Sequence, residues 1–223
     1  MLELPSHAPT SEEELLERAD QLAGRTLGEI ARAIDEEVPP SLRRDKGWVG
    51  RLLEKCLGAD AGNRAAPDFV ELDVELKSLP VDATGKPLET TYVTTVELTD
   101  FDGLEFENST LAHKLRRVLW TPIHAEPDLP HRMVGTSVLW SPDDHELEQI
   151  RRDWEWHIRT IRDGYVDNIE GSDGEVLQIR PKAANSDAKT WGLDPYGEAI
   201  MTMPRGFYLR PVFTEYLLQK HFF

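Results

Sequence analysis

The sequence predicts a mixed α/β fold, because segments with helical periodicity alternate with short segments typical of strands. Residues 143–164 place apolar side chains at intervals of three or four, as on one buried face of a helix. Segments with the apolar and β-branched composition of strands lie at 74–77, 90–98, 176–182 and 205–210. At 223 residues the chain is long enough for one large domain or two small lobes.

Capping signals place two helices near the N-terminus. Ser11 and Thr26 are each followed three residues later by glutamate, the pattern of a capping box. The first helix is expected to end at Gly24, and the second near Ala33. Residues 1–10 contain two prolines and are expected to be flexible.

The remaining elements follow from local composition. Pro142 and two acids after Ser141 predict a helix whose cap is Ser141. We also expect a helix over 49–57, a strand at 104–107, a helical turn leading into a buried strand over 113–123, and a closing helix over 214–223.

The most informative stretch is DFVELDVELK, from Asp68 to Lys77. Side chains two apart share one face of a strand, so Glu75 and Lys77 are expected to project together. A turn or a second strand could bring Asp68 beside them. Two carboxylates suit Mg²⁺, and a lysine beside them could orient or deprotonate a metal-bound water. The functional hypothesis is metal-dependent phosphodiester hydrolysis centred here, although so short a pattern occurs often by chance and is more commonly a solvated strand face.

Two features ahead of this stretch extend the hypothesis. Lys46 lies in the basic turn 43–50, directly before a predicted helix, where it could contact phosphate or be part of a solvated turn. Glu54 lies within that helix. It is either an exposed acid or, if turned toward Asp68, an additional metal ligand.

The charge distribution limits the class of protein. The net charge of −16 argues against a simple nucleic-acid coat protein, since phosphate repels a uniformly acidic surface. Residues 176–223, however, carry six basic and four acidic side chains, which leaves a basic cleft possible. A lone cysteine, Cys56, excludes an intrachain disulfide, and no run of about 20 apolar residues occurs. We therefore expect a cytoplasmic protein without a membrane partner.

Six segments, in order along nearly the whole chain, resemble the MutH family of methyl-directed mismatch-repair endonucleases. They are RRDKGWVG at 43–50, PDFVELDVELKSLPVD at 67–82, HKLRRVLW at 113–120, LWSP at 139–142, LQIRPKAAN at 177–185 and MPRGFYL at 203–209.

The resemblance implies a single restriction-endonuclease-like domain over residues 1–223, with a central mixed sheet, flanking helices and two arms around a DNA cleft. It implies Mg²⁺-dependent nicking of the unmethylated strand at hemimethylated GATC, 5′ to the G. MutL would activate the enzyme in a MutS-dependent pathway.

Individual roles follow from the matched motifs. Asp68 and Glu75 would be metal ligands, Lys77 the catalytic lysine and Glu54 a supporting acid. The residues expected to approach DNA are Lys46, Lys114, Arg180, Lys182 and Tyr208, with Lys182 and Tyr208 as candidates for sensing adenine methylation.

Two departures and two alternatives accompany the resemblance. Tyr92 stands where phenylalanine is expected, and residues 191–197 match weakly, so no function is assigned to them. One alternative is a restriction enzyme of the same fold that cuts both strands at GATC. The other is a DNA-binding adaptor without catalytic activity.

Overall fold

The computed structural model describes residues 2–43, 45–62, 64, 66–182 and 187–222, and the chain divides into two compact units. The first unit comprises Met1–Glu89, Arg116–Ser141 and Leu218–Phe223; the second comprises Thr90–Leu115 and Pro142–Leu217. Both combine strands with helices, which confirms the mixed α/β class. Among the described residues, no helix is both long and apolar enough to cross a membrane.

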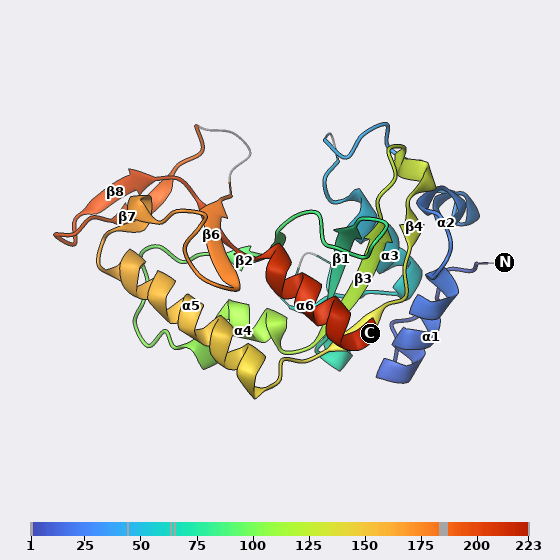
Figure 1. The fold of residues 1–223 in the computed structure, drawn as a ribbon, viewed down its shortest axis with the longest axis horizontal. Helices are drawn as coiled ribbons and strands as arrows, with labels where there is room; N and C mark the ends of the chain where they lie inside the picture. Colours follow the sequence, from blue (N-terminus) through green and yellow to red (C-terminus); the bar gives the residue numbers. More distant parts are fainter. Residues whose placement is uncertain (1, 44, 63, 65, 183–186, 223) are drawn as a thin grey trace. The chain divides into compact units, whose positions relative to one another are not determined.

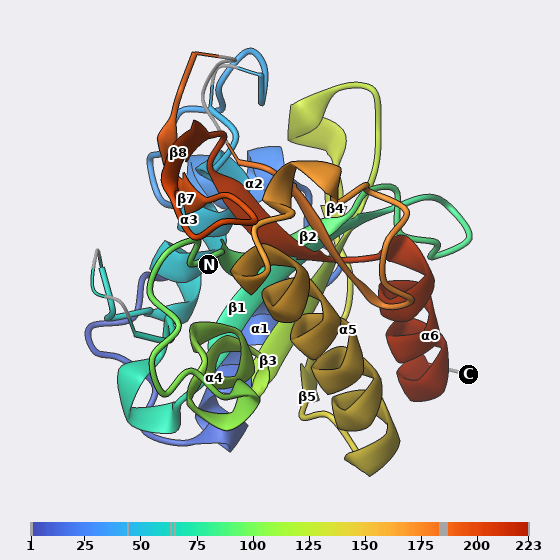
Figure 2. The same ribbon diagram turned by 90° about the vertical axis from the view of Figure 1, so that its left-hand side faces the viewer.

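The first unit is built on a four-stranded mixed sheet. β1 (Glu75–Val81) runs parallel to β3 (Val118–His124), as Figures 1 and 2 show. β3 also pairs antiparallel with β4 (Met133–Val134) and β5 (Val138–Trp140). Because β3 has neighbours along both edges, its first six residues are buried, as the apolar run over 118–123 predicts.

Three helices supply most of the remaining core of this unit. They are α1 (Glu12–Leu22), α2 (Leu27–Ala33) and α3 (Trp48–Leu57). Their apolar faces pack with β1, β3 and β4 into one cluster. The predicted caps are confirmed: the hydroxyl oxygens of Ser11 and Thr26 accept hydrogen bonds from the backbone N–H groups of Glu14 and Glu29.

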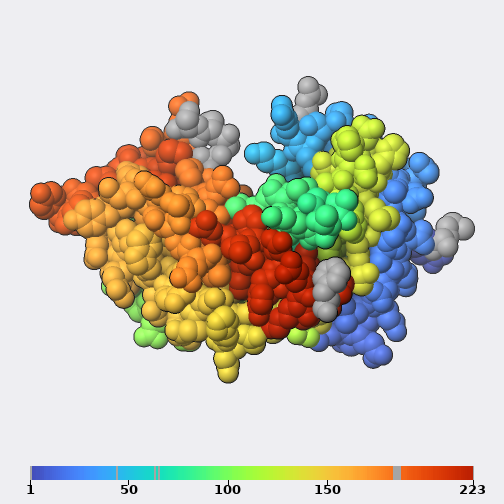
Figure 3. All heavy atoms as spheres, viewed as in Figure 1, coloured from blue at the N-terminus to red at the C-terminus, as the bar shows by residue number. Residues whose placement is uncertain are grey.

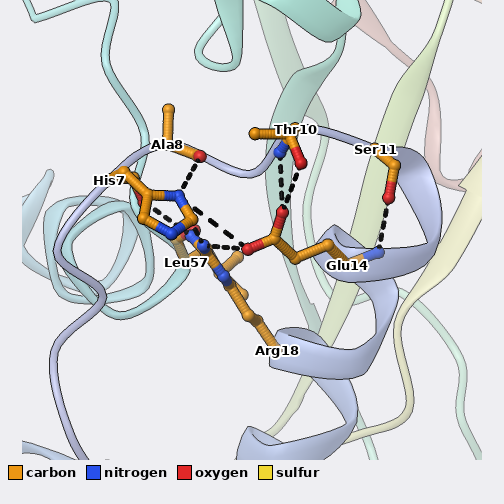
Figure 4. Close-up of polar contacts among 7 residues, drawn as sticks. All are labelled: His7, Ala8, Thr10, Ser11, Glu14, Arg18 and Leu57. Carbon is orange, nitrogen blue, oxygen red and sulfur yellow. Dashed lines mark hydrogen bonds and ion pairs between the residues drawn. The ribbon is translucent and has the colours of Figure 1, made fainter.

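The segment ahead of α1 is packed, which differs from the expectation of a flexible tail (Figure 4). The Glu14 carboxylate accepts hydrogen bonds from the backbone N–H and the hydroxyl of Thr10, at 2.8 and 2.9 Å. Arg18 forms an ion pair with Glu14 and donates to the carbonyl oxygen of Leu57. Arg18 also donates to the carbonyl oxygen of His7 at 3.0 Å, and together with the Thr10 bonds and the burial of Leu2 this holds the segment against α1.

The second unit contains a three-stranded antiparallel sheet. β9 (Arg205–Leu209) lies between β2 (Thr91–Thr95) and β6 (Leu177–Pro181). α5 (Asp144–Arg162) packs beside β6, and α4 (Thr110–Leu115) lies against β2. A separate hairpin, β7 (Thr190–Leu193) and β8 (Ala199–Thr202), projects from this unit (Figures 1 and 3).

The last helix is α6 (Pro211–Phe222). Short 3₁₀ helices occur at Val70–Leu72, Phe106–Asn108, Leu129–His131 and Val166–Asn168.

Several local predictions were wrong. Residues 104–107 do not form a strand: Phe106 begins a 3₁₀ turn and packs edge-on against Trp154, with ring centroids 5.7 Å apart. The cap of α5 is Asp143, which forms a reciprocal capping box with Glu146, whereas the Ser141 hydroxyl donates to a backbone carbonyl of the chain before β3. The β7–β8 hairpin was not predicted, and α6 begins earlier than residue 214. Phe223, at the end of the expected closing helix, lies outside the described residues.

Candidate active site and nucleic-acid interface

A tight turn places Asp68 and Glu75 at opposite ends of one short hairpin. Between them, Phe69 and Val74 exchange two backbone hydrogen bonds, of 3.0 and 3.3 Å. Asp73 closes the turn with a φ of 53°, in the left-handed region that aspartate tolerates better than most residues. Of the two arrangements expected, a turn or a second strand, the structure has the turn.

The Asp68 side chain is held over the beginning of β1. Its Oδ2 accepts a hydrogen bond of 2.8 Å from the backbone N–H of Leu76. Its own carbonyl oxygen accepts bonds from the N–H groups of Asp60 and Ala61, at 3.0 and 3.3 Å. Side chain and backbone are thus both fixed, so the carboxylate has a defined direction without a bound ion.

Glu75 and Lys77 lie on one face of β1 and form an ion pair. Glu75 is only 3% exposed, and the Lys77 side chain is 14% exposed. The alternative of a solvated strand face is therefore wrong, because both faces of the strand are covered at this end. The lysine charge offsets the cost of burying the Glu75 carboxylate. The backbone N–H of Glu75 donates to the carbonyl of Arg117 at 3.0 Å, which ties this end of β1 to β3.

Glu54 approaches the same cluster from α3. Burial raises the pKa of this half-buried carboxyl, and the negative charges of Asp68 and Glu75 raise it further. The positive charges of Arg51 and Lys77 act in the opposite direction. Three acids and one lysine from α3 and the 68–77 hairpin therefore share one electrostatic environment.

The donor set fits a hard divalent cation held by few protein ligands. Within the described part of the chain, no group of three or more His, Cys, Asp or Glu side chains has the geometry of a complete metal site. Mg²⁺ does not require such a group, since it is commonly held by one or two carboxylates together with waters and substrate phosphate. Asp68 and Glu75 supply those two carboxylates.

A second group of predicted residues lies on the sheet of the second unit. Arg180 is exposed near the end of β6, and Lys182 follows that strand. The guanidinium of Arg180 lies over the ring of Tyr208 on β9, 5.9 Å from its centroid. Burial raises the pKa of the Tyr208 phenol. Two cations and an aromatic ring on one sheet are suited to contact phosphates and base edges.

The other two predicted DNA-contacting lysines lie in different units. Lys46 is exposed just before α3 in the first unit. Lys114 is half-buried on α4 in the second unit. Residues 183–185, which end the motif that contains Lys182, lie outside the described residues.

Two contributors to these sites were not assigned a role from the sequence. Arg117 acts through its backbone carbonyl, and no side-chain pattern signals such a contact. Tyr92 was noted only as a departure from an expected phenylalanine, yet its ring lies 3.8 Å from the Lys182 ammonium. An aromatic residue in a strand that pairs with the MPRGFYL segment is the signal that could have suggested it.

Comparison with known proteins decides the family. Residues 57–153 match the family model described as the DNA mismatch repair enzyme MutH. The MutH protein of Serratia proteamaculans is 51% identical over 217 residues, covering 96% of this chain and 95% of the relative. The chain belongs to the MutH family. The MutH proteins of Klebsiella pneumoniae and Escherichia coli K12 are each 50% identical, over 97% and 96% of this chain and 95% and 94% of theirs.

One solved structure also aligns with this MutH-family chain over most of its length. It is the complex of the restriction endonuclease MvaI with its cognate DNA, with 13% identity, a TM-score of 0.38, and coverage of 93% of this chain and 97% of the other.

Proposed function

We propose that this MutH-family chain is a Mg²⁺-dependent endonuclease that nicks the unmethylated strand of hemimethylated GATC, 5′ to the G, in cytoplasmic DNA mismatch repair. The observation that carries the proposal is the convergence of Asp68, Glu75 and Lys77 on one hairpin, with Glu54 beside them. An adaptor without activity would have no need to hold buried charges together, since such groupings are costly unless compensated.

Asp68 and Glu75 would hold the cation. When bound, Mg²⁺ stabilises negative charge on the phosphate oxygens and lowers the pKa of a coordinated water. Asp68 is already oriented by the backbone N–H of Leu76, and Glu75 by Lys77. These two carboxylates therefore need to move little before the substrate phosphate enters.

The reaction is an in-line displacement at phosphorus. A water oxygen forms a new bond to phosphorus while one P–O ester bond to deoxyribose breaks. The water proton leaves toward the acidic cluster, and the departing deoxyribose oxygen takes up a proton from solvent to give a hydroxyl. Lys77 orients the attacking water and offsets the charge that builds up on the phosphate. Glu54, whose pKa is raised, is suited to take up a proton at the edge of the cluster.

Recognition would involve the remaining predicted residues. Lys46 and Lys114 would contact phosphates near the cut, because lysine ammonium groups bind the DNA backbone as point charges. Arg180 and Lys182 would donate to guanine O6 and N7, and Tyr208 would lie beside the adenine N6 position, where methylation changes the contact. MutL would activate the enzyme, with MutS acting upstream.

The decisive experiment is a nicking assay on three plasmids that differ only at GATC: unmethylated, hemimethylated and fully methylated. We expect Mg²⁺-dependent nicking of the unmethylated strand, stimulated by MutL, no cutting of the fully methylated plasmid and no cutting in EDTA. Rapid double-strand breaks in unmethylated plasmid without MutL would instead show a restriction-type enzyme. Binding without cleavage under all conditions would indicate an adaptor.

A further inference from the structure

The three-stranded sheet of the second unit carries a ladder of two cations and two aromatic rings, defined here as Arg180, Tyr208, Tyr92 and Lys182. The Arg180 guanidinium lies over the Tyr208 ring at 5.9 Å. The rings of Tyr208 and Tyr92 meet edge to face, with centroids 5.4 Å apart and planes at 62°. The Lys182 ammonium lies over the Tyr92 ring at 3.8 Å, the shorter of the two cation–ring contacts.

The strand register explains why these four side chains meet. Tyr92 on β2 is the direct partner of Tyr208 on β9, so the two rings share one face of the sheet. Arg180 on β6 is the partner of Gly206 on β9, two residues before Tyr208 and therefore on the same face. The backbone N–H of Lys182 donates to a carbonyl of the chain that enters β9, at 2.7 Å, which brings this lysine to the end of the ladder.

Gly206 provides the space in which the ladder forms. A Cβ atom at this position would lie 3.0 Å from Cε2 of Tyr92, 3.2 Å from Cε2 of Tyr208 and 3.3 Å from Cβ of Lys182. The first two contacts are with ring atoms, which move only if the whole side chain rotates. An alanine at 206 would therefore force one of the rings or the lysine to shift by a few tenths of an ångström, so glycine favours the close approach of these side chains.

We propose that Tyr92 is a positioning residue for DNA recognition: its ring fixes the direction of the Lys182 ammonium, and Gly206 leaves the room for that contact. The proposal rests on the proposed function, in which Lys182 donates to base edges. A lysine side chain has four rotatable bonds, and holding its head group over a ring reduces the entropy lost when it contacts DNA. The face of a phenylalanine ring would serve equally, whereas an aliphatic side chain would not.

The contact itself can be measured without DNA. Ring currents from Tyr92 shift the proton resonances of the Lys182 ε-methylene group upfield, and NMR of selectively labelled lysine reports that shift. We expect the shift to persist in Tyr92→Phe and to vanish in Tyr92→Leu. Its absence in the wild-type protein would overturn the proposal, whatever the outcome of the nicking assays.

A double-mutant cycle on DNA affinity tests the positioning role. Tyr92→Leu is expected to weaken binding to a GATC duplex by roughly 2- to 5-fold, the range for a cation–ring contact at an exposed site, and Tyr92→Phe to restore it. In the Lys182→Met background, Tyr92→Leu should have no further effect. The same loss in both backgrounds would show that Tyr92 contacts DNA directly and would reject the proposal.

Two further variants complete the design. Tyr165→Leu removes an exposed tyrosine of the same unit outside the ladder and should leave both the lysine resonance and the affinity unchanged. Gly206→Ala should reduce the Lys182 upfield shift, because a ring or the lysine must move, while the circular dichroism spectrum remains that of the wild type. A shift of wild-type size in Gly206→Ala would contradict the role given to the glycine.

Discussion

Lys77 forms an ion pair with Glu75 two residues away on the same face of β1, and little of either side chain is exposed. The pair lies beside Asp68, whose carboxylate is fixed by a backbone N–H. The charges of the proposed active site are therefore arranged by the fold before metal or substrate arrives. Such preorganisation reduces the reorganisation needed during the reaction.

Loss of Lys77 should destabilise the protein when no metal is present. We expect Lys77→Met to lower the free energy of unfolding by about 3 kcal/mol in EDTA, because Glu75 stays buried without this counter-charge. Urea denaturation monitored by circular dichroism measures the change. The Glu75→Gln/Lys77→Met double variant should regain part of the loss; equal destabilisation of the single and double variants would contradict the charge argument.

The same two residues should be needed for the chemical step. We expect Glu75→Ala and Lys77→Ala to reduce nicking by at least about 10²-fold. Duplex binding should be largely retained, because neither residue belongs to the three-stranded sheet of the second unit that is proposed to contact the bases. Plasmid nicking and fluorescence anisotropy with a labelled GATC duplex separate the two effects. Nicking at the wild-type rate by either variant would remove that residue from the mechanism.

Asp68 allows a test of metal binding separate from folding. In Asp68→Asn the amide oxygen can still accept the hydrogen bond from Leu76, but the negative charge is lost. We expect unchanged stability in EDTA and a loss of the rise in melting temperature that Mg²⁺ gives the wild-type protein. Asp20→Asn, on the exposed side of α1, is the matched control and should keep the full response to Mg²⁺.

Sequence reasoning succeeded where local rules decide the outcome. The caps at Ser11 and Thr26 and the turn between Asp68 and Glu75 each depend on residues close together in the chain. The cap of α5 was misplaced by two residues because Ser141 and Asp143 both satisfy the capping rule, and tertiary contact decided between them. The Ser141 hydroxyl is engaged by the backbone of Arg116, leaving Asp143 to cap.

Contacts between distant segments could not be predicted from one sequence. Burial of Glu75 depends on the packing of β1 against β3 and α3, which are distant in the sequence. The alternation of apolar and polar residues over 74–77 could not show that this face of the strand is covered, so a solvated face stayed open as an alternative. The contact of Lys182 with Tyr92 joins residues that are 90 positions apart in the sequence. It depends on the register in which β9 pairs with β2 on one side and β6 on the other. The β7–β8 hairpin was not predicted because its strands have four residues each and each strand buries only one residue, which leaves little apolar alternation to detect.

His157 should make stability depend on pH. Its side chain is fully buried, one ring nitrogen, Nε2, is 3.2 Å from the carbonyl of Leu177, and burial lowers its pKa below the usual 6.5. The neighbouring charges of Asp153 and Asp173 act against this shift without cancelling it. The unfolded chain therefore binds a proton at higher pH than the folded chain, so stability is complete above about pH 6.5 and falls as the pH decreases toward the lowered value.

Replacement of His157 tests this dependence. His157→Gln keeps a donor for the Leu177 carbonyl but cannot titrate, so its free energy of unfolding should fall less than that of the wild type between about pH 7.5 and 5.5. Chemical denaturation at both pH values measures the difference. His113→Gln, at an exposed position on α4, should follow the wild type. Parallel curves for His157→Gln and the wild type would show that the buried histidine does not contribute.

Affinity for DNA should be weak and strongly dependent on salt. The chain carries a net charge of −16, so attraction must come from local groups such as Lys46, Lys114, Arg180 and Lys182. About four phosphate or base contacts by cations predict a roughly 10²-fold loss of affinity between about 50 and 200 mM salt. Lys46→Gln should reduce the slope of log affinity against log salt by about 1. Lys55→Gln is the control: it removes a lysine already paired with Glu36 and should leave the slope unchanged. Tight binding of the wild-type protein that is insensitive to salt would show that recognition does not depend on these cations.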